Sequence, residues 1–243
     1  MARSRPEDPA PVPFAGFGPN ALPFFAELAA NQTRDWFQAN KATYETQVRA
    51  PLAALVEALA FAFEVHDIHL TGDPKRALFR IHRDVRFSKN KNPYKTNAGA
   101  VMTRDGSKGG NGLLYIQIGG SDGSFMGVGF YGLEPKDLSI LRHAIADGPE
   151  RWLGVKSALS EANLVFSSGY AMTRLPKGFE SHAGSAVAED LKLRNLIVSR
   201  PIAADRLRDA DLVHDIVDFA AAGLPLLRFG WSALDRARGQ ALA

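Results

Sequence analysis

The chain has no cysteine among its 243 residues. It therefore cannot form disulfides, hold zinc or an iron–sulfur cluster through thiolates, or use a cysteine as a nucleophile. Long apolar runs are also missing: the longest, Ala53–Phe63, covers 11 residues, contains Glu57 and is too short to span a bilayer. Neither the H-E-x-x-H zinc motif nor a phosphate-binding P-loop occurs. These absences leave charge and periodicity as the informative features.

The N-terminal residues are rich in proline. Residues 1–13 contain four prolines and two charges of each sign, and the apolar core of a secretory signal does not follow Arg3 and Arg5. This composition predicts an extended or disordered arm over residues 1–13, followed by a single domain over residues 14–243. We expect a cytoplasmic protein.

Helical periodicity dominates the first part of the domain. A short helix is expected at about Pro23–Ala29, because proline suits the first helical position. Asn31 or Thr33 can cap a longer helix, which Pro51 kinks or restarts because proline has no N–H to donate. The apolar stripe of that longer helix recurs every three, four or seven residues: Phe37, Tyr44, Val48, Leu52, Leu55, Leu59 and Phe63.

The middle of the chain changes to the alternation of apolar and polar residues that is typical of strands. Strands are expected at about residues 77–87, 98–103, 112–118 and 124–131, and the connections between them are short. Short connections join antiparallel neighbours, because a parallel crossover needs about a dozen residues or more. The middle of the chain therefore predicts an antiparallel sheet.

Helices return after this region. Helical spacing is expected over residues 135–147, 150–161, 186–196 and 211–222, with the last helix ending at Gly223, extended chain at 197–201 and a helical tail at 224–242. Helices on both sides of the strands indicate an α+β fold. We predict a single domain in which helices from the N- and C-terminal parts cover a mostly antiparallel sheet.

Positive charge is concentrated in residues 75–95, which we call the basic segment. It holds eight basic residues against one acid, Asp84, a net charge of +7. The rest of the chain has 21 basic and 25 acidic residues, a net charge of −4, so the overall value of +3 hides this patch. Such a concentration repels itself unless acids from elsewhere or a bound anion neutralise it.

We predict an anion-binding site in the basic segment. Arginine suits bidentate contacts to phosphate, and a loop over residues 88–97 gives its lysines access to a ligand. On a regular strand Arg83 would fall on the core side, so we expect it to be paired or to lie at a bulge. Alanine at Arg86 would then weaken phosphate binding roughly ten- to a hundredfold. The predicted site residues are Arg80, Arg83, Arg86, Lys91, Tyr94 and Lys95.

Two further patterns have simpler explanations. Gly127, Gly129 and Gly132 match the spacing of a dinucleotide-binding loop, but they lie inside an expected strand rather than in the turn after one. We expect Gly127 and Gly129 to pack closely against another element. His66 and His69 are expected to be exposed rather than to bind a metal. No metal site and no cofactor is predicted.

The basic segment also resembles a known family. The run Arg80–Asn97, R-I-H-R-D-V-R-F-S-K-N-K-N-P-Y-K-T-N, is similar to the signature of the proteins grouped as domain of unknown function 2461. Agreement continues around Arg34–Phe37 and Leu175–Phe179, and it extends from about Phe14 to Phe229. The resemblance implies a single domain and supplies no activity.

Three interpretations of the basic segment stay open. It binds phosphate or a phosphorylated small molecule, as an enzyme or without catalysis; or it belongs to a nucleic-acid-associated module in which Tyr94 and Trp36 stack on bases; or its arginines form internal ion pairs that stabilise the fold. Steep salt dependence would favour nucleic acid, whereas the negative charge outside the segment weighs against it. A membrane partner is not expected.

Overall fold

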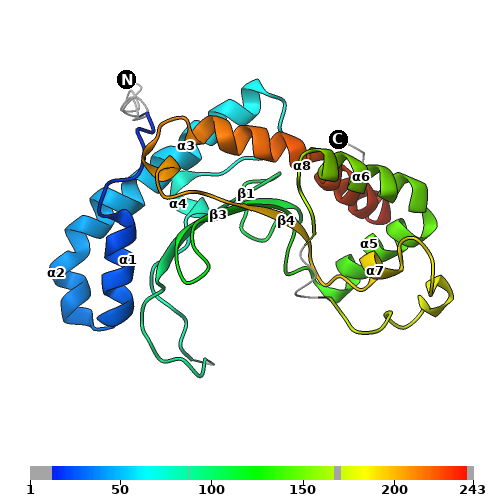
Figure 1. Ribbon diagram of the computed structural model, residues 1–243, viewed down its shortest axis with the longest axis horizontal. Helices are drawn as coiled ribbons and strands as arrows, with labels where there is room; N and C mark the ends of the chain where they lie inside the picture. Colours follow the sequence, from blue (N-terminus) through cyan, green and yellow to red (C-terminus); the bar gives the residue numbers. More distant parts are fainter. Residues whose placement is uncertain (1–12, 87, 167–170, 240–243) are drawn as a thin grey trace, which may run out of the picture.

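At the centre of the molecule lies an antiparallel sheet of four strands in the order β1-β2-β3-β4. The computed structural model describes residues 13–86, 88–166 and 171–239, so most of the expected arm at 1–13 lies outside the described residues. The predicted α+β fold is confirmed (Figure 1). The strands are β1 (Asn97–Thr103), β2 (Leu113–Gly119), β3 (Phe125–Phe130) and β4 (Leu196–Pro201).

The strands expected at 98–103, 112–118 and 124–131 correspond to β1, β2 and β3, but the strand expected at 77–87 is wrong. That stretch makes isolated bridges instead, Leu78 to Ala100 and His82 to Tyr94. It runs beside β1 and then bends back on itself, so its alternating residues do not form a continuous ladder. The fourth strand is β4, which pairs with β3 where only extended chain was expected.

The N-terminal helices follow the predicted pattern, except that the first begins at Ala21, so Pro23 is not its first residue. The Thr33 hydroxyl caps the second helix by accepting a hydrogen bond from the Trp36 N–H at 3.3 Å. The expected restart near Pro51 is confirmed, because a π-helical turn precedes it. The Gln47 carbonyl, to which Pro51 cannot donate, accepts a hydrogen bond from the Gly18 N–H at 3.2 Å. These elements are α1 (Ala21–Ala30), α2 (Arg34–Tyr44), η1 (Glu45–Arg49) and α3 (Ala50–Val65).

The helices of the C-terminal part differ from the prediction in two places. Of the helix expected at 186–196, only one turn forms, at Ala188–Leu191. The other apolar residues of this stretch are buried in turns and at the start of β4 instead. The last helix does not end at Gly223: a Cβ there would overlap the Val128 side chain, so this glycine serves close packing on β3. The remaining elements are α4 (Pro74–Ala77), α5 (Pro135–Asp147), α6 (Pro149–Glu161), η3 (Glu180–His182), α7 (Ala188–Leu191), η4 (Arg206–Arg208) and α8 (Leu212–Ala237).

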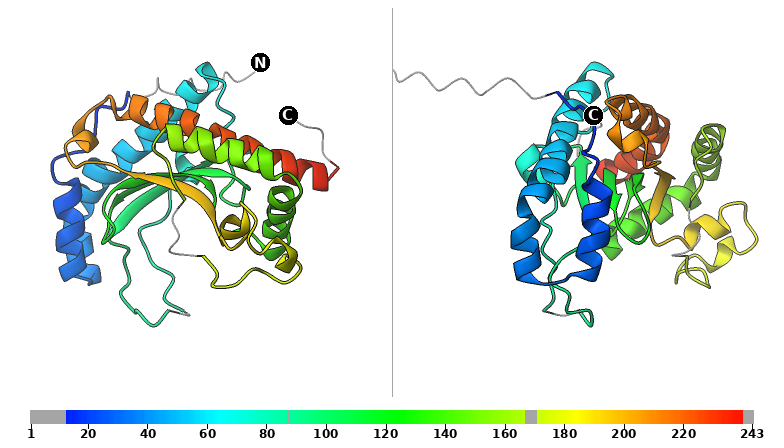
Figure 2. Two further views of the ribbon diagram at one scale, coloured as in Figure 1. Left: turned by 45° about the vertical axis from the view of Figure 1, so that its right-hand side comes forward. Right: turned by 60° about the vertical axis from the view of Figure 1, so that its left-hand side comes forward.

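The two faces of the sheet have different surroundings. Helices α3 and α8 pack on one face, where Ile116, Val128 and their neighbours are completely buried (Figures 1 and 2). On the opposite face, which we call the open face, Tyr115, Gln117 and Phe125 stay partly accessible, and in Figure 1 the helices lie above and beside the sheet rather than over this face. The open face is therefore the more accessible side of the sheet, although Val101 and Gly127, which flank Tyr115, are buried.

Gly127 and Gly129 lie inside β3, as predicted. At Gly129 the backbone has a φ of +138°, and a Cβ there would collide with the Leu196 carbonyl oxygen of β4. Gly127 is less tightly enclosed, because a Cβ there would meet only the end of the Ile197 side chain at 3.3 Å. The expected close packing against a neighbouring element is thus tight at Gly129 and looser at Gly127.

Candidate functional site

The basic segment forms a bent ribbon at the edge of β1. The Phe79 N–H donates to the Gly99 carbonyl of β1 at 2.8 Å, which fixes the start of the ribbon against the sheet. Farther along, the Arg83 N–H donates to the Pro93 carbonyl and the Lys95 N–H to the Ile81 carbonyl, both at 2.8 Å. The chain thus returns on itself and places Lys95 beside the residues that follow Phe79.

Two ammonium groups lie over the Phe79 ring, and the charges of two arginines act on one of them. We call this group of four cations the Phe79 cluster: Arg80, Arg83, Lys95 and Lys108. The ammonium groups of Lys95 and Lys108 lie 5.3 and 4.8 Å from the centre of the Phe79 ring, within the range of a cation–π contact. Lys108 also donates to the Leu78 carbonyl at 2.6 Å. The cations come from the ribbon, the chain before β1 and the loop between β1 and β2.

The charges that act on Lys95 are all positive. Burial lowers the pKa of Lys95, and the positive charges of Arg80, Lys108 and Arg83 lower it further. Within the described part of the chain, none of the four cations of the cluster takes part in an ion pair. The charge on the Lys95 ammonium is therefore destabilised in the folded protein.

Two residues of the predicted site are engaged elsewhere. Arg86 forms a two-point contact with Asp84, from Nε to Oδ1 at 3.0 Å and from NH2 to Oδ2 at 2.7 Å, and its side chain is 76% exposed. Hydrogen bonds from Arg86 lower the pKa of the Asp84 carboxyl. Lys91 donates to the Val85 carbonyl at 2.9 Å and closes the loop. The one acid of the basic segment thus forms its ion pair with Arg86, and the charge of Arg80 in the Phe79 cluster lowers its pKa to a smaller extent.

Tyr94 lies in the core rather than on a surface. Its residue is only 3% exposed, and its ring stacks on Phe37 with centroids 4.5 Å apart and an interplanar angle of 18°. Trp36 packs against Phe24, with ring centroids 5.6 Å apart. Of the two rings that were expected to stack on bases in a nucleic-acid-associated module, that of Tyr94 is therefore buried, whereas that of Trp36 is half-buried.

Lys108 was not predicted from the sequence. It belongs to the stretch 104–111, whose glycine, serine and aspartate content indicates only a hairpin loop. The connection between β1 and β2 turns back toward Phe79 in the folded chain, and no local pattern reports that approach. Its basic side chain, set among glycine and serine, is the one signal that could have drawn attention to it.

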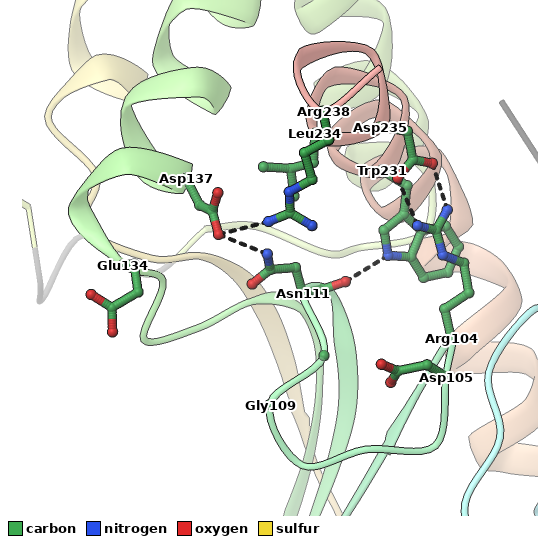
Figure 3. A pocket seen from close by; sticks show the side chains of 11 residues that line it. Arg104, Asp105, Gly109, Asn111, Glu134, Asp137, Trp231, Leu234, Asp235 and Arg238 are labelled. Atoms are coloured by element: carbon green, nitrogen blue, oxygen red, sulfur yellow. Dashed lines mark hydrogen bonds and ion pairs between the residues drawn. The ribbon is translucent and has the colours of Figure 1, made fainter. Parts of the chain in front are cut away.

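A separate pocket of about 440 Å³ lies between the β1–β2 loop and the ends of α5 and α8 (Figure 3). Arg104 binds the buried Asp235 through two hydrogen bonds of 2.7 Å. Arg238 and the Asn111 amide both donate to Asp137 at 2.8 Å. Since both arginines are already neutralised by aspartates, this pocket ties α8 to the sheet and to α5 rather than offering free cations.

Two other groups of residues are candidates for catalytic or metal-binding sites, and their geometry does not support either role. Gly119–Gly123 matches the G-x-S-x-G spacing of hydrolase nucleophiles, but the motif requires a turn from a strand into a helix. Here it forms the hairpin turn between β2 and β3, and the exposed Ser121 hydroxyl donates to the neighbouring Asp122 at 3.3 Å. His69 lies 3.1 Å from the Asp67 carboxylate at the surface. Within the described residues, no three potential metal ligands come together.

The sequence matches the model of a protein family over residues 20–229, and that family is described as Conserved hypothetical protein (DUF2461). The chain belongs to this family, as the resemblance of the basic segment indicated. Comparison with curated proteins and with solved structures gave no match. Among the described helices, none has the length and apolar character needed to cross a bilayer. The case for a function therefore rests on the geometry of the Phe79 cluster.

Proposed function

We propose that this protein binds a phosphate-containing small molecule at the Phe79 cluster. The observation that carries the proposal is the approach of the Lys95 and Lys108 ammonium groups to one ring. The charges of Arg80 and Arg83 also act on Lys95, and among the described residues none of the four cations forms an ion pair. Holding like charges together costs free energy, and a bound anion offsets that cost. Arginine and lysine together supply the directed and the point-charge contacts that phosphate oxygens accept.

The alternative of an internal ion-pair network has less support. In such a network each cation would face a carboxylate, as Arg104 faces Asp235 in the pocket of Figure 3. The charges that act on Lys95 are instead all positive. The nucleic-acid alternative loses one of its two expected stacking residues, because Tyr94 is buried and only Trp36 stays partly accessible.

Replacing Lys95 with glutamine is expected to weaken binding of pyrophosphate about tenfold or more, because a charge-assisted hydrogen bond contributes about 1.5–3 kcal/mol. Isothermal titration calorimetry at low salt measures this change. The matched control is Lys89→Gln, which removes the same charge from an exposed position in the neighbouring loop. We expect Lys89→Gln to retain nearly the full affinity.

The same variant separates ligand binding from a structural role. Without anion, Lys95→Gln should melt at the same temperature as the wild-type protein or higher, because it removes a like charge from the cluster. A network of internal ion pairs would give the opposite result, a clear loss of stability. Absence of pyrophosphate binding by the wild-type protein at low salt would also contradict the proposal.

A further inference from the structure

We propose that the ligand of the Phe79 cluster is a nucleoside phosphate, whose base lies on a row of aromatic rings across the open face. This inference rests on the proposed function, because it takes the cluster as the phosphate site. It adds the chemical class of the rest of the ligand: a flat, aromatic group attached to the phosphate.

The row of rings starts at the cluster itself. Phe79 lies at the edge of β1, Tyr115 in β2 and Phe125 in β3, so consecutive rings occupy consecutive positions across the sheet. The ring centroids of Phe79 and Tyr115 are 6.1 Å apart with an interplanar angle of 64°, and those of Tyr115 and Phe125 are 5.8 Å apart with an angle of 54°. The rings are thus tilted against one another, and a base stacks on the face of one ring at a time. All three residues are partly accessible. Aromatic rings presented on an accessible sheet face are a platform on which bases stack.

The position of Tyr115 is fixed by its neighbours. Its hydroxyl lies 3.3 Å from the Gln117 side-chain oxygen, which also accepts a hydrogen bond from the Asn97 amide at 3.0 Å. Gly99 of β1 leaves the space that the ring occupies, since a Cβ there would lie 2.7 Å from the Tyr115 hydroxyl. A preorganised ring loses less conformational freedom on stacking than a mobile one. Gln117 and Asn97 also place polar groups beside the platform.

The distribution of charge favours a mononucleotide over a strand. The cations gather at the Phe79 end of the row, close to the Lys95 and Lys108 ammonium groups. Arg200 of β4 reaches the helix-covered side instead, where it lies over the Phe219 ring at 5.5 Å and donates to the Ala162 carbonyl. A nucleic-acid strand needs cations along its backbone, whereas one nucleotide needs them at one end.

Comparison of ADP and UDP with pyrophosphate tests this inference, because the three probes share a diphosphate and only the nucleotides carry a base. We expect the wild-type protein to bind at least one nucleotide about tenfold more tightly than pyrophosphate in calorimetric titrations. Phe125→Leu should remove most of that advantage and leave pyrophosphate affinity unchanged. Phe61→Leu, at a ring that is 71% exposed on α3, is the matched control and should change neither affinity.

The wild-type protein supplies a second measurement that needs no variant. In saturation-transfer NMR, the base protons of the bound nucleotide should receive more saturation than the ribose protons, because the base contacts the rings. Pyrophosphate binding without any advantage for ADP or UDP would overturn this inference and leave the proposed function intact. Failure of pyrophosphate itself to bind would overturn the proposed function. Much tighter binding of an eight-nucleotide oligothymidylate than of either nucleotide would overturn the assignment to a small molecule.

Discussion

Replacing Gly129 with alanine is expected to lower the free energy of unfolding by about 3 kcal/mol or more. The φ of +138° at Gly129 is a conformation that L side chains rarely adopt, and a Cβ would collide with the Leu196 carbonyl oxygen in β4. Both obstacles belong to the backbone, so rotation of a side chain cannot relieve them. For a chain of this size we expect the melting temperature to fall by roughly 6–12 °C.

Gly127→Ala is the matched control for this prediction. Gly127 lies in the same strand, and the nearest atom to an added Cβ is the end of the Ile197 side chain at 3.3 Å, which can move. We expect the free energy of unfolding of this variant to stay within about 0.5 kcal/mol of the wild-type value. Urea unfolding of the two variants measures the difference. Equal losses would show that the conformation at Gly129 carries no special constraint.

Strand β2 was predictable from the sequence because only one of its faces is buried, whereas β1 and β3 are buried at almost every position. In β2, Leu114, Ile116 and Ile118 are buried and alternate with the more accessible Tyr115 and Gln117. Burial of one face enforces such a period of two residues. The same period of two residues at 77–87 led to the wrong prediction of a strand. A segment that bends beside the edge of a sheet can alternate apolar and polar residues without forming a continuous ladder of hydrogen bonds. Alternation of apolar and polar residues shows which side chains share a face, but it does not show which backbone groups form hydrogen bonds.

The Phe79 cluster was predictable only in part. The concentration of charge in the basic segment drew attention to Arg80, Arg83 and Lys95, which the folded chain does bring together. It could not exclude Tyr94, since an aromatic residue among lysines gives no sign that its ring stacks on Phe37 in α2. It could not include Lys108, which approaches through tertiary structure. Local composition therefore locates a charged region in the sequence, but long-range contacts in the folded chain determine which residues belong to the site.

The second large effect is expected from breaking the ion pair between Asp235 and Arg104. The two residues are 131 positions apart in the sequence, and their pairing joins α8 to the sheet. The Asp235 side chain is only 4% exposed, whereas that of Arg104 is 33% exposed and so retains some contact with water. Breaking a buried ion pair costs about 3–5 kcal/mol. Partial exposure of the arginine reduces this value, and we expect Asp235→Asn to lower the free energy of unfolding by about 2–3 kcal/mol.

The effect of Asp235→Asn should depend on pH in a defined direction. Hydrogen bonds from Arg104 hold the pKa of the Asp235 carboxyl below its usual value in the folded protein. The unfolded chain therefore takes up a proton first as the pH falls, near a pKa of about 3.9, and the contribution of the carboxylate is lost below that point. The difference in stability between the wild-type protein and Asp235→Asn should thus be constant from pH 7 to about pH 5 and should shrink toward pH 3.

Urea unfolding at a series of pH values measures this convergence. Asp218→Asn is the matched control, because Asp218 is exposed on the same helix, α8. Its stability should follow that of the wild-type protein at every pH. A difference for Asp235→Asn that persisted undiminished to pH 3 would show that the shape of the side chain stabilises this junction and its charge does not. If the stability of Asp235→Asn approaches that of the wild-type protein at low pH, while Asp218→Asn matches the wild-type protein throughout, the ion pair with Arg104 is what attaches α8 to the sheet.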